Sequence, residues 1–396
     1  MKNYKNNILQ TKQKGNSFFT LLFSLYLSLS LIRFLWPEQA LLTSMVMGLG
    51  IFFLLYCITK IQRKDLPIYI YIWLLILAFM VGSILVYRTN RIVHVIIFIL
   101  NNTGVALLIY KGLIKSWGVY IVFYALTLYF GFLMFSGADP NASLKVVSRN
   151  GFSMMMLVTV TSLYIILTIE KKKIDIKPAI ITLIISIWAV GRSGILSSAV
   201  LLLGILFITS RTKKIIIAII FIPIITIYFY FDSILIFLVN NSISLDALTY
   251  QLIKSGEEEP DVRMEIWQNY FNNLDYFRLI FGANILTDPW PDGKLLNYNY
   301  HNSYINLHLQ TGIMGIITMV LMIFSLIKFY KKNIIFFILF ISIILRWSTD
   351  IGLFFESWDF IIFFFIFYYL QDTFYRLFHL RYSGKNGKVQ KSDLVI

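Results

Sequence analysis

Residues 66–87 read Leu-Pro-Ile-Tyr-Ile-Tyr-Ile-Trp-Leu-Leu-Ile-Leu-Ala-Phe-Met-Val-Gly-Ser-Ile-Leu-Val-Tyr and contain no charged side chain. About 20 consecutive apolar residues are what an α-helix needs to cross the hydrocarbon core of a bilayer. The apolar residues of this run are continuous, whereas a strand of a membrane β-barrel alternates between apolar and polar side chains. The run therefore predicts a transmembrane helix.

Similar runs recur along the whole chain of 396 residues, which is 58% hydrophobic and 14% charged. A soluble domain carries about 25% charged residues. The sequence thus predicts an all-α polytopic membrane protein with about 12 transmembrane helices. Their expected ranges are 17–36, 40–59, 66–87, 92–110, 117–136, 151–169, 179–190, 195–210, 215–231, 311–327, 333–348 and 355–370.

The distribution of lysine and arginine over the connections predicts the orientation of the helices. With the N-terminus in the cytoplasm, most cations fall on the cytoplasmic side, as the positive-inside rule requires. Both termini are then cytoplasmic. The net charge of +15 is explained by this topology and by attraction to anionic lipids, so nucleic-acid binding has no support.

The cations predicted to lie outside are mostly arginine, whereas those inside are mostly lysine. A guanidinium group can bind two phosphate oxygens at once through parallel hydrogen bonds, and it is always charged. The bias therefore indicates a site for a phosphate-bearing ligand, with a chance excess among few residues as the open alternative. The outer arginines are Arg88, Arg91, Arg149, Arg192, Arg263, Arg278 and Arg346.

One connection is much longer than the others, and it divides the chain. We expect helices one to nine in residues 1–231, an extracytoplasmic loop in 232–310, helices ten to twelve in 311–370 and a cytoplasmic tail in 371–396. A long loop in a chain of otherwise short loops is usually functional.

Within this loop, an amphipathic surface helix is expected to begin near Pro260. Four apolar residues recur at helical spacing after it, namely Trp267, Tyr270, Phe271 and Leu274.

The candidate site residues each have a structural alternative. Arg192 lies in the turn Gly191–Gly194 between two short spans, where it binds a ligand or serves as an ordinary turn cation. Arg263 could be a solvated helix charge, and Arg149 a plain helix cap. His301 has an imidazole suited to general-base catalysis near neutral pH, or it is an interfacial histidine with a satisfied hydrogen bond.

Other classes of site have little support in the sequence. No glycine-rich loop resembles a phosphate cradle or a nucleotide fold. His301 and His308 are seven residues apart, which is not a metal-ligand spacing, and no HExxH pattern occurs. We therefore expect no cofactor and no metal. The single cysteine, Cys57, excludes an internal disulfide.

Four motifs together resemble one protein family. They are Gly191-Arg-Ser-Gly-Ile-Leu, Asp261-Val-Arg-Met-Glu-Ile-Trp, His301-Asn-Ser-Tyr-Ile-Asn-Leu and Gly312-Ile-Met-Gly. Their order and spacing are similar to those of the O-antigen ligase and polymerase superfamily. The resemblance covers about residues 180–330, and the plan of twelve spans agrees with it over the rest of the chain.

The resemblance implies glycosyl transfer at the outer face of a bacterial cytoplasmic membrane. The donor and acceptor would be oligosaccharide repeat units linked to polyprenyl diphosphate, joined into capsular, exopolysaccharide or O-antigen chains with inversion at the sugar carbon. Partners would be membrane lipids and, in the pathway, flippase and chain-length regulator proteins. A ligase acting on another acceptor and a non-enzymatic flippase or transporter of lipid-linked glycans are the alternatives.

The same resemblance assigns roles to residues. Arg192 and Arg263 would grip the diphosphate and stabilise the charge on the leaving group. His301 would deprotonate or orient the acceptor hydroxyl, or else bind a phosphate oxygen. The residues expected to bind substrate are Arg149, Asn302, Tyr304 and Trp267.

Overall fold

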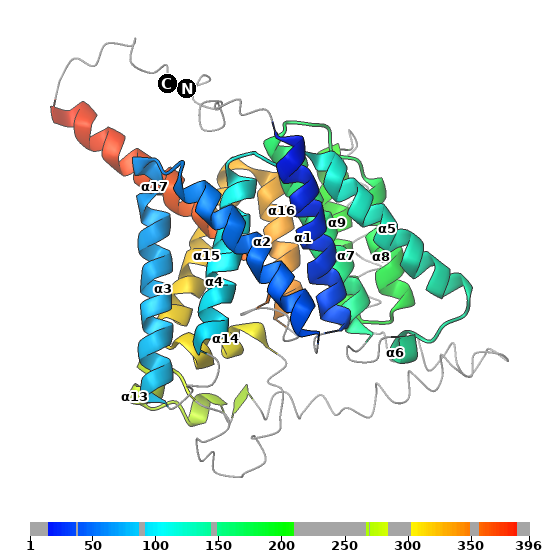
Figure 1. The fold of residues 1–396 in the computed structure, drawn as a ribbon, viewed down its shortest axis with the longest axis horizontal. Coiled ribbons are helices and arrows are strands. Elements are labelled where there is room, and N and C mark those ends of the chain that lie inside the picture. Colours follow the sequence, from blue (N-terminus) through cyan, green and yellow to red (C-terminus); the bar gives the residue numbers. More distant parts are fainter. Residues whose placement is uncertain are drawn as a thin grey trace.

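The computed structural model describes residues 15–36, 39–86, 92–143, 149–209, 267–268, 270–283, 302–348 and 356–385, and within these ranges every regular element is a helix (Figure 1). The long helices are α1 (Ser17–Leu35), α2 (Ala40–Ile58), α3 (Leu66–Leu85), α4 (Ile92–Tyr110), α5 (Ser116–Phe135), α7 (Asn150–Ile169), α8 (Lys177–Trp188), α9 (Arg192–Thr209), α15 (Ile313–Lys332), α16 (Ile334–Trp347) and α17 (Phe360–Lys385).

These helices match eleven of the twelve expected spans. Eight described helices are long and apolar enough to cross a membrane, while α8, α16 and residues 360–375 form shorter apolar helices. The expected ninth span, 215–231, lies outside the described residues, so the count of twelve stays a prediction. The described chain has the character of an all-α polytopic membrane protein.

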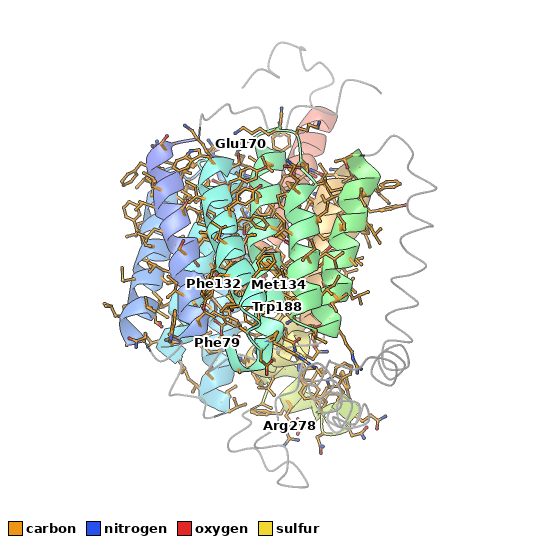
Figure 2. The ribbon with its side chains drawn as sticks, turned by 90° about the vertical axis from the view of Figure 1, so that its right-hand side faces the viewer. Phe79, Phe132, Met134, Glu170, Trp188 and Arg278 are labelled. Atoms are coloured by element: carbon orange, nitrogen blue, oxygen red, sulfur yellow. The ribbon has the colours of Figure 1, made fainter. Side chains whose placement is uncertain are left out.

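Helix α7 lies at the centre of one half of the bundle. It contacts α5, α8, α9 and α16, and every residue from Gly151 to Leu167 is buried. Figure 2 shows Glu170, just after α7, and Arg278, in the short helix α13 (Tyr276–Phe281), at opposite ends of the molecule.

Helices α2 and α4 approach each other through two glycines. A Cβ atom built on Gly104 would lie 2.2 Å from the Gly50 carbonyl oxygen, and one built on Gly50 would lie 1.6 Å from Asn101 Oδ1. No larger residue fits at either position without moving a helix. Small residues allow such close approach in membrane bundles, where dispersion contacts must replace the hydrophobic effect.

Buried carboxylates tie helices together at the lysine-bearing end of the bundle. Asp65 accepts hydrogen bonds from Lys111 Nζ (3.1 Å) and Gln371 Nε2 (2.7 Å). Asp372 pairs with Lys328 and Lys332, each at 2.6 Å. These contacts explain why α17 continues past residue 370, where the twelfth span was expected to end, because Gln371 and Asp372 face protein partners there.

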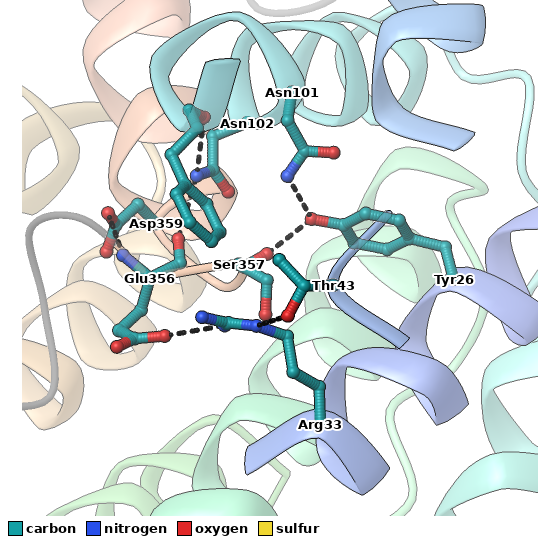
Figure 3. Close-up of polar contacts among 9 residues, drawn as sticks. Tyr26, Arg33, Thr43, Asn101, Asn102, Glu356, Ser357 and Asp359 are labelled. Atoms are coloured by element: carbon teal, nitrogen blue, oxygen red, sulfur yellow. Dashed lines mark hydrogen bonds and ion pairs between the residues drawn. The ribbon is translucent and has the colours of Figure 1, made fainter. Parts of the chain in front are cut away.

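A second polar network fastens the start of α17 to α1, α2 and α4 (Figure 3). Arg33 of α1 binds Glu356 Oε2 at 2.9 Å and Thr43 Oγ1 at 3.1 Å. Asn102 of α4 donates to the Glu356 carbonyl at 2.8 Å and accepts from the Phe360 amide at 3.0 Å. The Arg33 charge inside an apolar span is thus neutralised by an acidic partner.

Three short helices lie at the end opposite the lysines. They are α6 (Pro140–Ser143), α13 and α14 (Ser303–Thr311) (Figure 1). Gly312, with φ at +55°, separates α14 from α15, so the tenth span begins at Ile313 and not at 311 as expected. The candidate site residues in the described chain all lie at this end.

Candidate functional site

The first turn of α7 is the point on which several candidate residues converge. A Cβ atom built on Gly191 would lie 2.6 Å from Asn150 Oδ1, and one built on Gly194 would lie 2.2 Å from Ser153 Oγ. The turn between α8 and α9 therefore sits directly on the start of α7. This contact brings Arg192, the first residue of α9, to the helix start that follows Arg149.

The backbone of that turn is strained. Val190 has φ at +54°, in the left-handed region that β-branched residues very rarely adopt. Such a conformation costs about 1–3 kcal/mol and persists only where surrounding contacts enforce it. Here the strain lies two residues before Arg192, whose side chain is exposed.

Arg346, near the end of α16, reaches the same place. Its side chain is only 1% exposed, and its Nη2 donates to the Asn150 carbonyl oxygen at 3.1 Å. Burying a guanidinium group is costly unless it is held by polar partners. Arg346 was expected among the outer arginines without a role of its own, although a cation inside the apolar range 333–348 is a signal of a polar site.

Helix α14 is also attached to the end of α16. Tyr304 donates its hydroxyl hydrogen to the Ile344 carbonyl oxygen at 2.9 Å. Burial raises the pKa of the Tyr304 hydroxyl, so this group stays neutral. The described contact of Tyr304 is structural, and it ties α14 to α16 at Ile344, two residues before Arg346.

Asn302 has a clear local task as the N-cap of α14. Its Oδ1 accepts hydrogen bonds from the amides of Tyr304 (2.9 Å) and Ile305 (3.2 Å). Capping satisfies amides that have no partner within the helix. Asn302 therefore defines where α14 begins, immediately after His301.

The expected amphipathic helix is present in part. Residues 267–268 and 270–272 are helical. Tyr270 is buried and Trp267 packs beside it, on a cluster that includes Ile305 and Leu309 of α14. Leu274 joins this cluster from beyond the helical residues, while Phe271 is 60% exposed. Trp267 thus connects its segment to α14.

A buried histidine joins the same two segments. Tyr270 donates its hydroxyl hydrogen to His308 Nδ1, and His308 Nε2 donates to the Leu279 carbonyl oxygen at 3.0 Å. Burial lowers the pKa of the His308 imidazole, while the hydrogen bond to Leu279 opposes this shift. The neutral ring therefore holds both Tyr270 and α13 against α14.

Two glycines with positive φ allow α13 and α14 to meet. A Cβ atom on Gly282 would lie 2.1 Å from the Leu309 carbonyl oxygen, and one on Gly312 would lie 2.0 Å from the Ile280 carbonyl oxygen. The φ angles are +80° and +55°, which favour glycine. Gly282 and the motif glycine Gly312 thus serve a backbone-to-backbone contact.

The described residues unite Arg149, Arg192, Asn302, Tyr304 and Trp267 at one end of the bundle through these contacts. His301 and Arg263 lie outside the described residues. Within the described part of the chain, no group of three or more His, Cys, Asp and Glu side chains gathers as metal ligands do. No family model and no curated protein matches the chain.

Proposed function

We propose that this protein is a membrane glycosyltransferase that polymerises oligosaccharide repeat units linked to polyprenyl diphosphate. The observation that carries the proposal is that the backbone positions of Arg149 and Arg192 lie at the first turn of α7, where the buried Arg346 binds the Asn150 carbonyl oxygen. Arginine side chains at one end of an apolar bundle suit a diphosphate held at a membrane surface. Lysines and their acidic partners gather at the other end.

The proposed topology has twelve spans with both termini in the cytoplasm, in agreement with this segregation of lysine and arginine. The arginine-bearing end and residues 232–310 then face outward. The protein would work in the bacterial cytoplasmic membrane beside a flippase and chain-length regulators.

The proposed reaction is a single inverting displacement. The acceptor hydroxyl oxygen attacks the donor sugar carbon, and the bond from that carbon to the diphosphate oxygen breaks. The hydroxyl proton passes to His301 or to solvent. Arg192 and Arg263 stabilise the negative charge on the departing diphosphate. Because the donor sugar is linked to polyprenyl diphosphate, the reaction needs no nucleotide sugar.

The test uses purified protein in detergent with a polyprenyl-diphosphate oligosaccharide. A ladder of longer glycans is expected, and it should disappear in His301→Ala and Arg263→Ala while both variants remain folded. Transfer of one block to a foreign acceptor would instead identify a ligase. Absence of transfer together with translocation in liposomes would identify a flippase, and normal ladders from both variants would refute the assigned roles.

A further inference from the structure

Helix α13 exposes an unusual amount of apolar surface for an element outside the long spans. Its sequence is Tyr-Phe-Arg-Leu-Ile-Phe, and none of these residues is buried. Tyr276 is 87% exposed and Phe277 is 47% exposed, and the preceding Phe271 is 60% exposed. Contiguous apolar patches of this kind mark contact with another apolar phase or partner.

The position of α13 indicates that lipid covers its exposed apolar residues. Helix α13 contacts the end of α3 (Figure 1), and α3 is a candidate membrane span. The outward side of α3 exposes Trp73 by 71% and Ile84 by 58%. In a membrane that side faces lipid, and α13 lies against the end of this span.

We propose that Phe271 and α13 lie in the boundary between lipid headgroups and acyl chains, in the leaflet at the arginine-bearing end. Aromatic rings favour this layer because it is apolar on one side and hydrated on the other. Arg278, the only charged residue of α13, donates to the Asn273 carbonyl oxygen at 2.9 Å and pairs with Asp275 at 3.6 Å. The charge of α13 is thus directed to its own polar N-terminal turn.

The partner is phospholipid because α13, with its exposed apolar residues, contacts a candidate membrane span whose own exposed side is apolar. A second copy of the chain would have to cover α3 and α13 together to exclude lipid from this surface. Amphipathic segments that lie in the interface insert their apolar side about 5–10 Å into the headgroup and acyl boundary.

This contact gives α13 a role in placing the candidate site. Gly282 and Gly312 lock α13 to α14, and Asn302 marks the start of α14. An anchored α13 therefore fixes the depth of that helix start relative to the lipid phosphates. This consequence depends on the proposed function, whereas the lipid contact does not.

The test measures depth with nitroxide labels in liposomes of phosphatidylethanolamine and phosphatidylglycerol. Cysteine is introduced by Tyr276→Cys or Phe277→Cys, at exposed positions where the fold tolerates it. The single native cysteine, Cys57, is fully buried, and the unsubstituted chain serves as the labelling blank. Trp73→Cys provides the lipid reference and Lys173→Cys, at an exposed loop position, provides the aqueous reference.

Relaxation by oxygen, which concentrates in lipid, is compared with relaxation by a water-soluble nickel chelate. The labels on α13 should give an oxygen-to-nickel ratio between those of the two references. A ratio equal to that of Lys173→Cys would place α13 in water and overturn the proposal. Low accessibility to both reagents would show a protein partner and also overturn it. The readout needs no turnover, so a chain inactive on lipid-linked glycans gives the same answer.

Discussion

Acidification should loosen the contact between α13 and α14 through protonation of His308. The neutral ring accepts a hydrogen bond from Tyr270 and donates one to Leu279. A protonated ring has no acceptor, so the hydrogen bond with Tyr270 must reverse its direction, and the charged ring is disfavoured by burial. Because burial lowers the His308 pKa, the open state takes up a proton at a higher pH than the closed state.

The sign of the effect follows from proton linkage. Stability of the contact is fully present above the ordinary histidine pKa of about 6.5 and is lost as the pH falls through the lower value of the closed state. Each unit of pKa depression contributes about 1.4 kcal/mol, or tenfold in the opening constant. Tyr270→Phe removes one hydrogen bond, about 0.5–1.5 kcal/mol, which raises opening by roughly 2- to 13-fold.

Hydrogen–deuterium exchange of peptides from residues 270–283, corrected for intrinsic rates, measures this opening between about pH 7.5 and pH 5, across the histidine range. Exchange should rise on acidification in the native chain and much less in His308→Gln. His94→Gln, an exposed histidine on α4, is the matched control and should behave as the native chain does. An unchanged acid response in His308→Gln would refute the reasoning.

Three further outcomes are expected. Gly282→Ala should increase exchange in α13, because the added methyl meets a carbonyl at 2.1 Å. Gly48→Ala meets nothing within 4 Å and should change the thermal midpoint little. Equal effects of the two substitutions would count against the contact between α13 and α14. Arg346→Gln should lower the free energy of unfolding by about 1.5–3 kcal/mol, the loss of a charged hydrogen bond. Arg192→Gln, at an exposed position, should leave this free energy unchanged and abolish chain extension. The reverse pattern would contradict the roles assigned to the two arginines. Val190→Gly should raise the free energy of unfolding by about 1 kcal/mol through relief of strain, and a loss of stability would show that the valine side chain matters more than the backbone.

The long helices could be predicted from sequence because a run of about 20 apolar residues is a local property of the chain. The start of α15 was predicted two residues too early. The helix begins after Gly312, whose positive φ is required by a close contact with Ile280, a residue far away in sequence. For the same reason Leu274 packs on the predicted apolar face from outside the helix.

The arrangement of the candidate site could be predicted only in part from the sequence. The motif that begins at Gly191 indicated Arg192, and the bias to arginine in the outer segments indicated Arg149. Their helices do adjoin. The part played by Arg346 depends on α16 ending beside α7, which periodicity and composition do not encode. The hydrogen bond from Tyr304 to the Ile344 carbonyl oxygen was not predicted either, again because helix neighbours are set by tertiary packing, and substrate binding by Tyr304 stays a prediction.

The short length of two helices has a consequence for the bilayer. Helix α8 has 12 residues and α16 has 14, so they extend about 18 and 21 Å at 1.5 Å per residue, against a hydrocarbon core of about 30 Å. Both begin at the lysine-bearing end, and at their far ends lie the turn with Arg192 and the guanidinium of Arg346. In the proposed topology, in which both helices are spans, the bilayer would thin there by about 10 Å, or protein and water would fill that depth. Either way, the diphosphate of the proposed substrate would meet Arg192 below the level of the surrounding lipid headgroups.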